Sequence, residues 1–101
     1  MRIAIVGAGK LGLKVINALV GGDHAITVFA TNEAVLNKIS NQYDVMTVAG
    51  NAKQISLLKE HGIESFDFLI ACTDNDEQNI VIASFAKKLG CSKVLARVRD
   101  P

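Results

Sequence analysis

A glycine-spaced turn near the N-terminus constrains the fold of this 101-residue chain more than any other feature. The apolar segment Arg2–Val6 runs directly into Gly7-Ala8-Gly9-Lys10-Leu11-Gly12, which has the spacing G-x-G-x-x-G. In such a turn the first glycine permits a tight passage from strand to helix, and the second lets the backbone approach a pyrophosphate. The third lets the helix pack closely on the strand. We therefore expect a strand, a phosphate-binding turn and a helix in residues 2–19.

The rest of the chain alternates between short apolar segments and amphipathic segments with helical periodicity. We expect helices between further strands at residues 25–29, 44–48, 66–72 and 93–98. Strict alternation with short connections and right-handed crossovers predicts a parallel sheet with helices on both faces. The glycine turn selects the strand order 3-2-1-4-5, so the expected fold class is α/β. It is a doubly wound, Rossmann-like sheet of five strands, in which a sixth strand can be missing.

Composition predicts a single domain over residues 1–101 and argues against several classes of function. Half of the residues are apolar and the formal net charge is +1, with acidic and basic side chains interspersed, so we expect no nucleic-acid partner. No apolar stretch approaches the roughly 20 residues of a membrane-spanning helix, and no signal peptide is recognisable, so we expect a cytoplasmic protein without direct membrane insertion. Cys72 and Cys91 lack metal-ligand spacing, which predicts reduced core thiols and no metal site.

Sheets of this kind bind ligands beyond the carboxyl ends of their strands, where the strand order reverses. We therefore expect one cleft, built from the turns that follow the strands. Its candidate cofactor-binding residues are Gly7, Ala8, Gly9, Lys10, Leu11, Gly12, Ala30, Thr31, Asn32, Asn51, Ala52, Thr73, Asp74, Asp76 and Arg97.

Two cations stand among these candidates, and each has a structural alternative. Lys10 lies inside the glycine turn, where it either reaches a phosphate as a point charge or is a solvated lysine of the first helical turn. Arg97 follows the fifth expected strand, where it either binds a phosphate bidentately or protects an exposed sheet edge from aggregation.

The polar candidates also have alternative roles. Thr31 and Asn32 can hydrogen-bond a ribose, or they can cap the second helix. Asn51 is expected to cap the third helix and Asp74 the fourth, the latter with an acid three residues later as in a capping box. Asp76 can face the cleft, hold a cation beside phosphates, or complement the helix dipole.

The second expected strand ends without the acid that a dinucleotide site usually carries about 20 residues after the glycine fingerprint. Ala30 stands at that end, and Glu33, the nearest carboxylate, belongs to the first turn of the next helix. The residues therefore leave the identity of the nucleotide open.

The assembled pattern resembles the N-terminal RCK domain, also called KTN or TrkA-N, of TrkA/KtrA-type regulators of potassium uptake. The resemblance covers nearly the whole chain, and T-D-x-D-E-x-N and A-R-V-R-x-P are more specific than the glycine turn. The matching stretches are residues 3–12, 43–46, 57–63, 70–79 and 96–101.

This resemblance implies a cytosolic regulatory subunit, peripheral to the membrane, that binds NAD(H) or ATP/ADP and gates a potassium channel or transporter. Family domains of this kind form homo-oligomers, as dimers or rings, and are not enzymes. Relatives carry Gln or Arg at the position of Lys10, and often acids at those of Ala30 and Asn51; Thr73, Asp74, Asp76 and Arg97 match.

Two other functions remain open at this point. The chain can be the cofactor-binding part of an NAD(P)-dependent oxidoreductase, although no His, Lys or Tyr stands near the ends of the fourth and fifth strands to donate a proton. It can also be a structural subunit whose site no longer binds a ligand.

Overall fold

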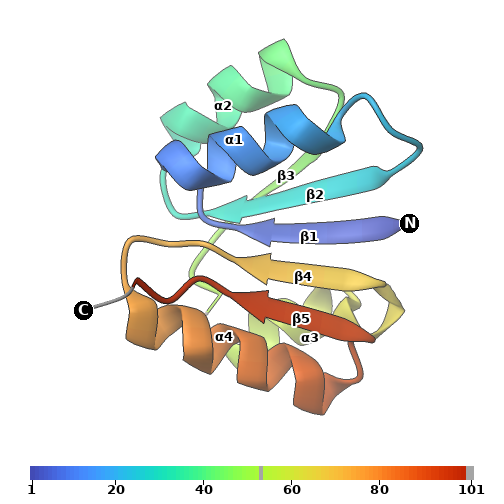
Figure 1. Ribbon diagram of the computed structural model, residues 1–101, viewed down its shortest axis with the longest axis vertical. Coiled ribbons are helices and arrows are strands. Elements are labelled where there is room, and N and C mark those ends of the chain that lie inside the picture. The colour runs from blue at the N-terminus through green and yellow to red at the C-terminus, as the bar shows by residue number, and fades with distance from the viewer. Residues whose placement is uncertain (53, 100–101) are drawn as a thin grey trace.

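The computed structural model describes residues 1–52 and 54–99, which form one five-stranded parallel sheet between two layers of helices (Figure 1). The strand order is β3-β2-β1-β4-β5, which confirms the predicted topology. Asp100 and Pro101, the last residues of the A-R-V-R-x-P motif, lie outside the described residues.

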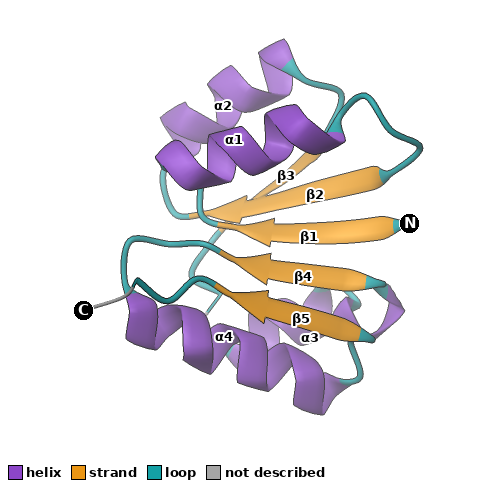
Figure 2. Ribbon diagram, viewed as in Figure 1, coloured by secondary structure: helices purple, strands orange, loops and turns teal. Residues whose placement is uncertain are grey.

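The elements alternate along the chain, as Figure 2 shows. The strands are β1 (Arg2–Val6), β2 (Ala25–Ala30), β3 (Met46–Ala49), β4 (Phe68–Ala71) and β5 (Lys93–Ala96). The helices are α1 (Lys10–Leu19), α2 (Glu33–Gln42), α3 (Ile55–Glu60) and α4 (Asp76–Leu89), and a short 3₁₀ helix, η1 (Ile63–Ser65), precedes β4.

Three strands are shorter than their apolar segments predict, because pairing with the neighbouring strand sets their bounds. β3 begins at Met46, opposite Thr27 of β2, whereas the Val45 N–H bonds locally to the Tyr43 carbonyl (3.0 Å). Likewise β4 begins at Phe68, opposite Ile3 of β1. β5 ends at Ala96, so the segment that carries Arg97 leaves the sheet earlier than expected.

Alternating residues of the central strands build a core on each face of the sheet. From β1, Ile3 and Ile5 face α1 and α2, together with Ile16 and Leu36 of those helices. Ala4 of β1 joins the opposite cluster, with residues of α3, η1 and α4. Buried apolar side chains thus pack on both faces of the sheet, and the turns at its carboxyl edge stand on this packed base.

Candidate functional site

The glycine turn has the backbone geometry that its spacing predicts. Gly7 has φ +108°, and a Cβ on it would lie 2.8 Å from the Cys72 carbonyl oxygen, so a side chain is excluded both by conformation and by space. A Cβ on Gly12 would lie 2.2 Å from the Gly7 carbonyl oxygen. The absence of side chains therefore lets α1 start directly against the ends of β1 and β4.

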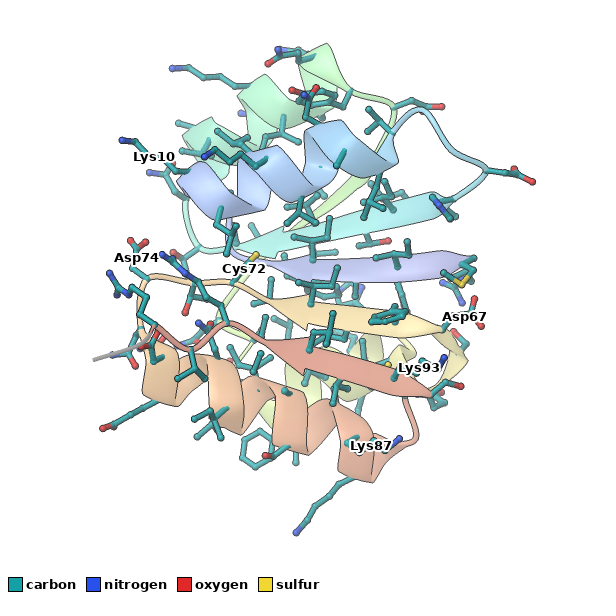
Figure 3. The ribbon with its side chains drawn as sticks, in the orientation of Figure 1. Lys10, Asp67, Cys72, Asp74, Lys87 and Lys93 are labelled. Carbon is teal, nitrogen blue, oxygen red and sulfur yellow. The ribbon has the colours of Figure 1, made fainter. Side chains whose placement is uncertain are left out.

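A cleft of about 440 Å³ opens at the carboxyl edge of the sheet, above the point where the strand order reverses. Ten of the predicted site residues line it: Gly7, Ala8, Gly9, Ala30, Thr31, Asn32, Asn51, Ala52, Thr73 and Asp74. Figure 3 shows Lys10, Cys72 and Asp74 at this edge, and Asp67 and Lys93 at the other.

Five predicted residues do not line this cleft. Lys10, Leu11 and Gly12 lie behind its rim in the first turn of α1. Asp76 is turned towards the chain after β5, where its carboxylate accepts the Arg99 N–H (2.9 Å) and lies 3.7 Å from the Arg99 Nε. Arg97 places its charge near the buried Cys72 thiol.

The helix ends around the cleft differ in a way that favours one of them as an anion site. At α1 the N-cap Gly9 provides no side-chain hydrogen bond, and the first turn contains Lys10 and no acid. By contrast, α2 begins with Glu33 after the cap Asn32, and α4 begins with Asp76 after its own cap. The backbone N–H groups and dipole of α1 thus face the cleft with no acid in the first turn of the helix itself. One carboxylate does lie close to this end: Asp74, from the turn after β4, has its Oδ1 3.5 Å from where a Cβ on Gly9 would stand.

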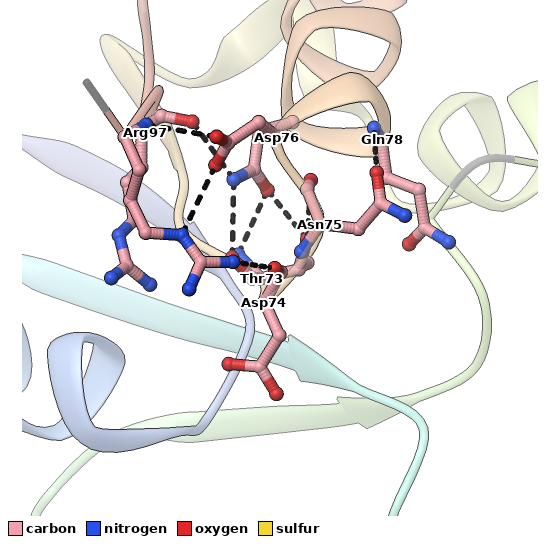
Figure 4. A network of polar contacts seen from close by, with 8 residues as sticks. Thr73, Asp74, Asn75, Asp76, Gln78 and Arg97 are labelled. Carbon is pink, nitrogen blue, oxygen red and sulfur yellow. Dashed lines mark hydrogen bonds and ion pairs between the residues drawn. The ribbon is translucent and has the colours of Figure 1, made fainter. Parts of the chain in front are cut away.

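The structure corrects the predicted caps of the third and fourth helices. Asn75, not Asp74, caps α4: its backbone is extended, and its side-chain oxygen accepts the Gln78 N–H (2.9 Å). The Asp74 carboxylate therefore caps no helix. It points away from the hydrogen bonds drawn around Thr73, Asn75 and Arg97 (Figure 4). Asn51 does not cap α3, which begins at Ile55 after Gln54.

Asn32 does take the capping role that was one of its two alternatives. Its side-chain oxygen accepts the Val35 N–H (3.1 Å) at the start of α2. Thr31, next to it, is exposed and lines the cleft, as does the side chain of Ala30 at the end of β2. Glu33 lines a separate shallow depression beside β3. The part of the cleft near Ala30 and Thr31, where a ribose is expected, therefore has no carboxylate from α2.

Three residues on the α4 side of the cleft were not among the candidate site residues. Asn75, Gln78 and Ile82 all line the cleft; Asn75 stands in a turn that was expected there, whereas sequence reasoning missed Gln78 and Ile82. Their spacing of three and four residues is that of one helix face, so the helical period could have placed them once Asn75 was known to be the cap. With Asp74 taken as the cap of α4, this face of the helix was not assigned to the cleft.

Burial raises the pKa of the Cys72 thiol to about 11, and the Arg97 guanidinium opposes this rise in pKa only in part. The thiol lies under the glycine turn, with its sulfur 3.9 Å from the Gly7 carbonyl oxygen. It is therefore a neutral packing group at neutral pH. Among the described residues, no group of His, Cys, Asp and Glu side chains is arranged to hold a metal ion.

The parallel sheet, the glycine turn and the cleft at the switch point define the class of Rossmann-like α/β domains. Residues 3–101 match the family model of the TrkA-N domain, and the chain belongs to this family. In the described part of the chain, no helix combines the length and apolar character that crossing a membrane requires.

Curated relatives agree with this assignment. The chain is 30% identical over 101 residues to the Trk system potassium uptake protein TrkA homolog of Methanothermobacter thermautotrophicus. This match covers 100% of the chain and 47% of that protein. It is 34% identical over 102 residues to TrkA of Mycobacterium tuberculosis, covering 100% of this chain and 46% of that one. The chain thus spans about half the length of these relatives.

Solved structures share the fold at low sequence identity. The NAD(P)-binding domain of an exopolyphosphatase-related protein from Archaeoglobus fulgidus superimposes with a TM-score of 0.85 at 13% identity, over 98% of this chain and 74% of that one. The Kef CTD of Shewanella denitrificans, in an AMP-bound form, has a TM-score of 0.81 at 19% identity. The superposition covers 99% of this chain and 60% of that one. These likenesses establish the Rossmann-like fold.

Proposed function

We propose that residues 1–101 form a nucleotide-binding regulatory domain of a potassium transport system, without enzymatic activity of its own. The observation that carries the proposal is the N-terminus of α1 at the rim of a cleft, where no side chain caps the helix and its first turn holds no acid. Fixed N–H donors and a helix dipole bind phosphate groups. The relatives named as potassium uptake proteins supply the physiological context.

In this proposal the ligand is NAD(H) or ATP/ADP, and its phosphates meet the turn from Gly7 to Gly12. Lys10 adds a mobile positive charge at that point. The ribose lies towards Ala30 and Thr31, and the base lies between the ends of β2 and β3, near Asn51 and Ala52. The cleft has room for a nucleotide, since ligand pockets run from about 300 to 1,000 Å³.

We further propose a homo-oligomer that acts on a membrane-embedded potassium channel or transporter from the cytoplasmic side. The names of the relatives support this partner. The near-neutral charge of the chain, +1, offers little attraction to nucleic acid. Regulation requires that the nucleotide bind two states of the assembly with different affinity.

Titration calorimetry with NAD, NADH, ATP, ADP and AMP tests the binding step. We expect saturable binding of at least one nucleotide, and weakening by about 1 kcal/mol in Lys10→Ala, because a charge-assisted contact with phosphate is lost. Lys14→Ala is the matched control, as Lys14 is an exposed lysine about one turn further along the same helix, away from the glycine turn. Absence of binding by every nucleotide at millimolar concentration would contradict the proposal.

The transport role needs a separate test in cells. Deletion of the gene is expected to impair growth at low external potassium, and reintroduction of the unsubstituted gene to restore it. Growth that does not depend on the gene at any potassium concentration would separate nucleotide binding from potassium transport. An oxidoreductase cofactor domain would then be the better interpretation of the same cleft.

A further inference from the structure

Asn79 of α4 is fully buried, at 0% exposure, and polar, and it was not among the predicted site residues. Its side-chain oxygen accepts the Thr73 N–H (2.8 Å) and the Thr73 hydroxyl (2.6 Å). Its side-chain nitrogen donates to the Thr73 carbonyl (3.1 Å) and to the Arg97 carbonyl (3.0 Å). One amide therefore joins the turn after β4 to the segment after β5 (Figure 4).

These partners fix both the position and the orientation of the amide. A primary amide offers two donor hydrogens and two acceptor lone pairs, and all four are used. A flipped amide would direct its hydrogens at the Thr73 N–H and its oxygen at two carbonyl oxygens. Because the group is buried, the loss of one partner leaves a desolvated polar atom.

The network also sets what Thr73 presents to the cleft. Its N–H and hydroxyl are both directed at Asn79, and its hydroxyl oxygen in turn accepts the Asn75 N–H (3.3 Å). Thr73 and Asn75 are wall residues of the cleft. Their placement therefore depends on a side chain that does not itself line the cleft.

We propose that Asn79 is the positioning residue of the nucleotide cleft: it holds the Thr73–Asn75 wall against the segment that carries Arg97. This inference rests on the proposed function, since it assigns Asn79 a role in nucleotide affinity. Asn79 touches no ligand in this proposal; it acts through the Thr73 turn.

Asn79→Asp is the sharpest variant, because it keeps the shape and removes the donor. At pH 8 the buried carboxylate faces the carbonyl oxygens of Thr73 and Arg97 and repels them. At pH 5.5 a protonated Asp side chain can donate again to one of them. We expect the dissociation constant for NAD, relative to the unsubstituted chain at the same pH, to rise of the order of tenfold at pH 8 and to recover towards the unsubstituted value at pH 5.5.

Two controls separate positioning from general destabilisation. Ile63→Val removes a methyl group from η1, in the core layer that α4 also joins and outside both loops, and is expected to leave NAD affinity unchanged. Asn79→Leu has no titrating group, so any affinity loss should be independent of pH. Circular dichroism at each pH verifies that every variant is folded, and the acidic measurement of Asn79→Asp keeps the test valid if Asn79→Leu does not fold.

Amide hydrogen exchange gives a readout without ligand. In the unsubstituted chain the Arg97 amide, which donates to the Ala71 carbonyl (2.8 Å), should be protected. In Asn79→Asp at pH 8 the carboxylate still accepts the Thr73 N–H but repels the Arg97 carbonyl, so the Arg97 amide should exchange faster while amides of β1 stay protected. Equal exchange at Arg97 in both proteins would overturn the proposal, as would an NAD affinity loss no larger than that of Ile63→Val. If the unsubstituted chain does not bind NAD or the other nucleotides, the proposed function fails, and with it the effect on affinity; exchange at Arg97 then decides alone whether Asn79 holds the two loops together.

Discussion

Cys72 shows how one residue can serve a site without taking part in its chemistry. The side chain is 2% exposed and fills the space under the glycine turn, where neither Gly7 nor Gly12 has room for a side chain of its own. A thiol suits this place because it is small, apolar and able to make a weak contact with the Gly7 carbonyl. The glycines and the cysteine are therefore one packing unit.

The raised pKa of Cys72 predicts a pH dependence of stability. The pKa is about 11 in the folded chain and near 9 when the thiol is solvated, so between these values only the unfolded state releases the proton. Stability due to the neutral thiol is complete below pH 9 and falls by roughly 1.4 kcal/mol per pH unit as the pH rises towards 11. Urea unfolding at pH 8 and pH 10.5 measures this.

Cys72→Ala is the control for that measurement, because alanine keeps a small apolar group and cannot titrate. Lysine and tyrosine side chains titrate over the same range in both proteins, so the difference between the two proteins isolates the thiol. An identical pH dependence in both would show that Cys72 ionises equally in the folded and unfolded chains.

At the scale of the element, the first turn of α4 combines three duties. Asn75 caps the helix, Asp76 holds Arg99, and Asn79 ties the Thr73 turn to Arg97. The Arg99 guanidinium also donates to the Asp74 carbonyl. This turn is thus the junction between the wall of the cleft and the chain that leaves β5.

The corrected cap gives a prediction that contrasts neighbouring residues. Asn75→Ala should lower the free energy of unfolding by about 1 kcal/mol, because the Gln78 N–H at the helix start loses its acceptor. Asp74→Ala should change it by less than about 0.5 kcal/mol, since that carboxylate caps nothing. Urea unfolding of both variants measures the two changes. A larger loss of unfolding free energy in Asp74→Ala would favour the capping box predicted from the sequence.

At the scale of the molecule, the sheet ends in two edge strands, β3 and β5. Each presents a large exposed apolar side chain: Met46 is 70% exposed on β3, and Leu95 is 54% exposed on β5. Open edges with apolar side chains are templates for pairing with further strands. The edges are therefore the part of this fold most prone to association.

Leu95→Lys tests that property. The variant should keep the unfolding free energy within about 0.5 kcal/mol, because the side chain is mostly in water, and should scatter less light during refolding at high concentration. Val94→Lys is the contrasting variant: Val94 is half-buried and packs against the core, so a charge there should destabilise the fold. A loss of stability in Leu95→Lys similar to that in Val94→Lys would show that Leu95 is covered in solution.

Much of the architecture follows from the sequence, because its determinants are local. The period of apolar residues distinguishes strand from helix, and the glycine turn specifies how β1 passes into α1. From these two features the strand order and the edge that holds the cleft could be predicted. The residues that line the cleft from the strand ends, such as Ala30 and Thr73, followed from the same argument.

Non-local contacts decided the rest. Asp74 and Asn75 are both good caps by composition, and the choice between them depends on where the Thr73 turn is held. Asn79 ties that turn to the carbonyl of Arg97, 18 residues further along the chain. An asparagine inside a helical segment does not indicate in the sequence which distant group it will bond. The sequence by itself determined the topology and the phosphate-binding turn, since backbone conformation and hydrophobic period are local properties. Only the tertiary structure decided which polar side chains face the cleft and which secure it, because that depends on hydrogen bonds between loops that meet only in the folded sheet.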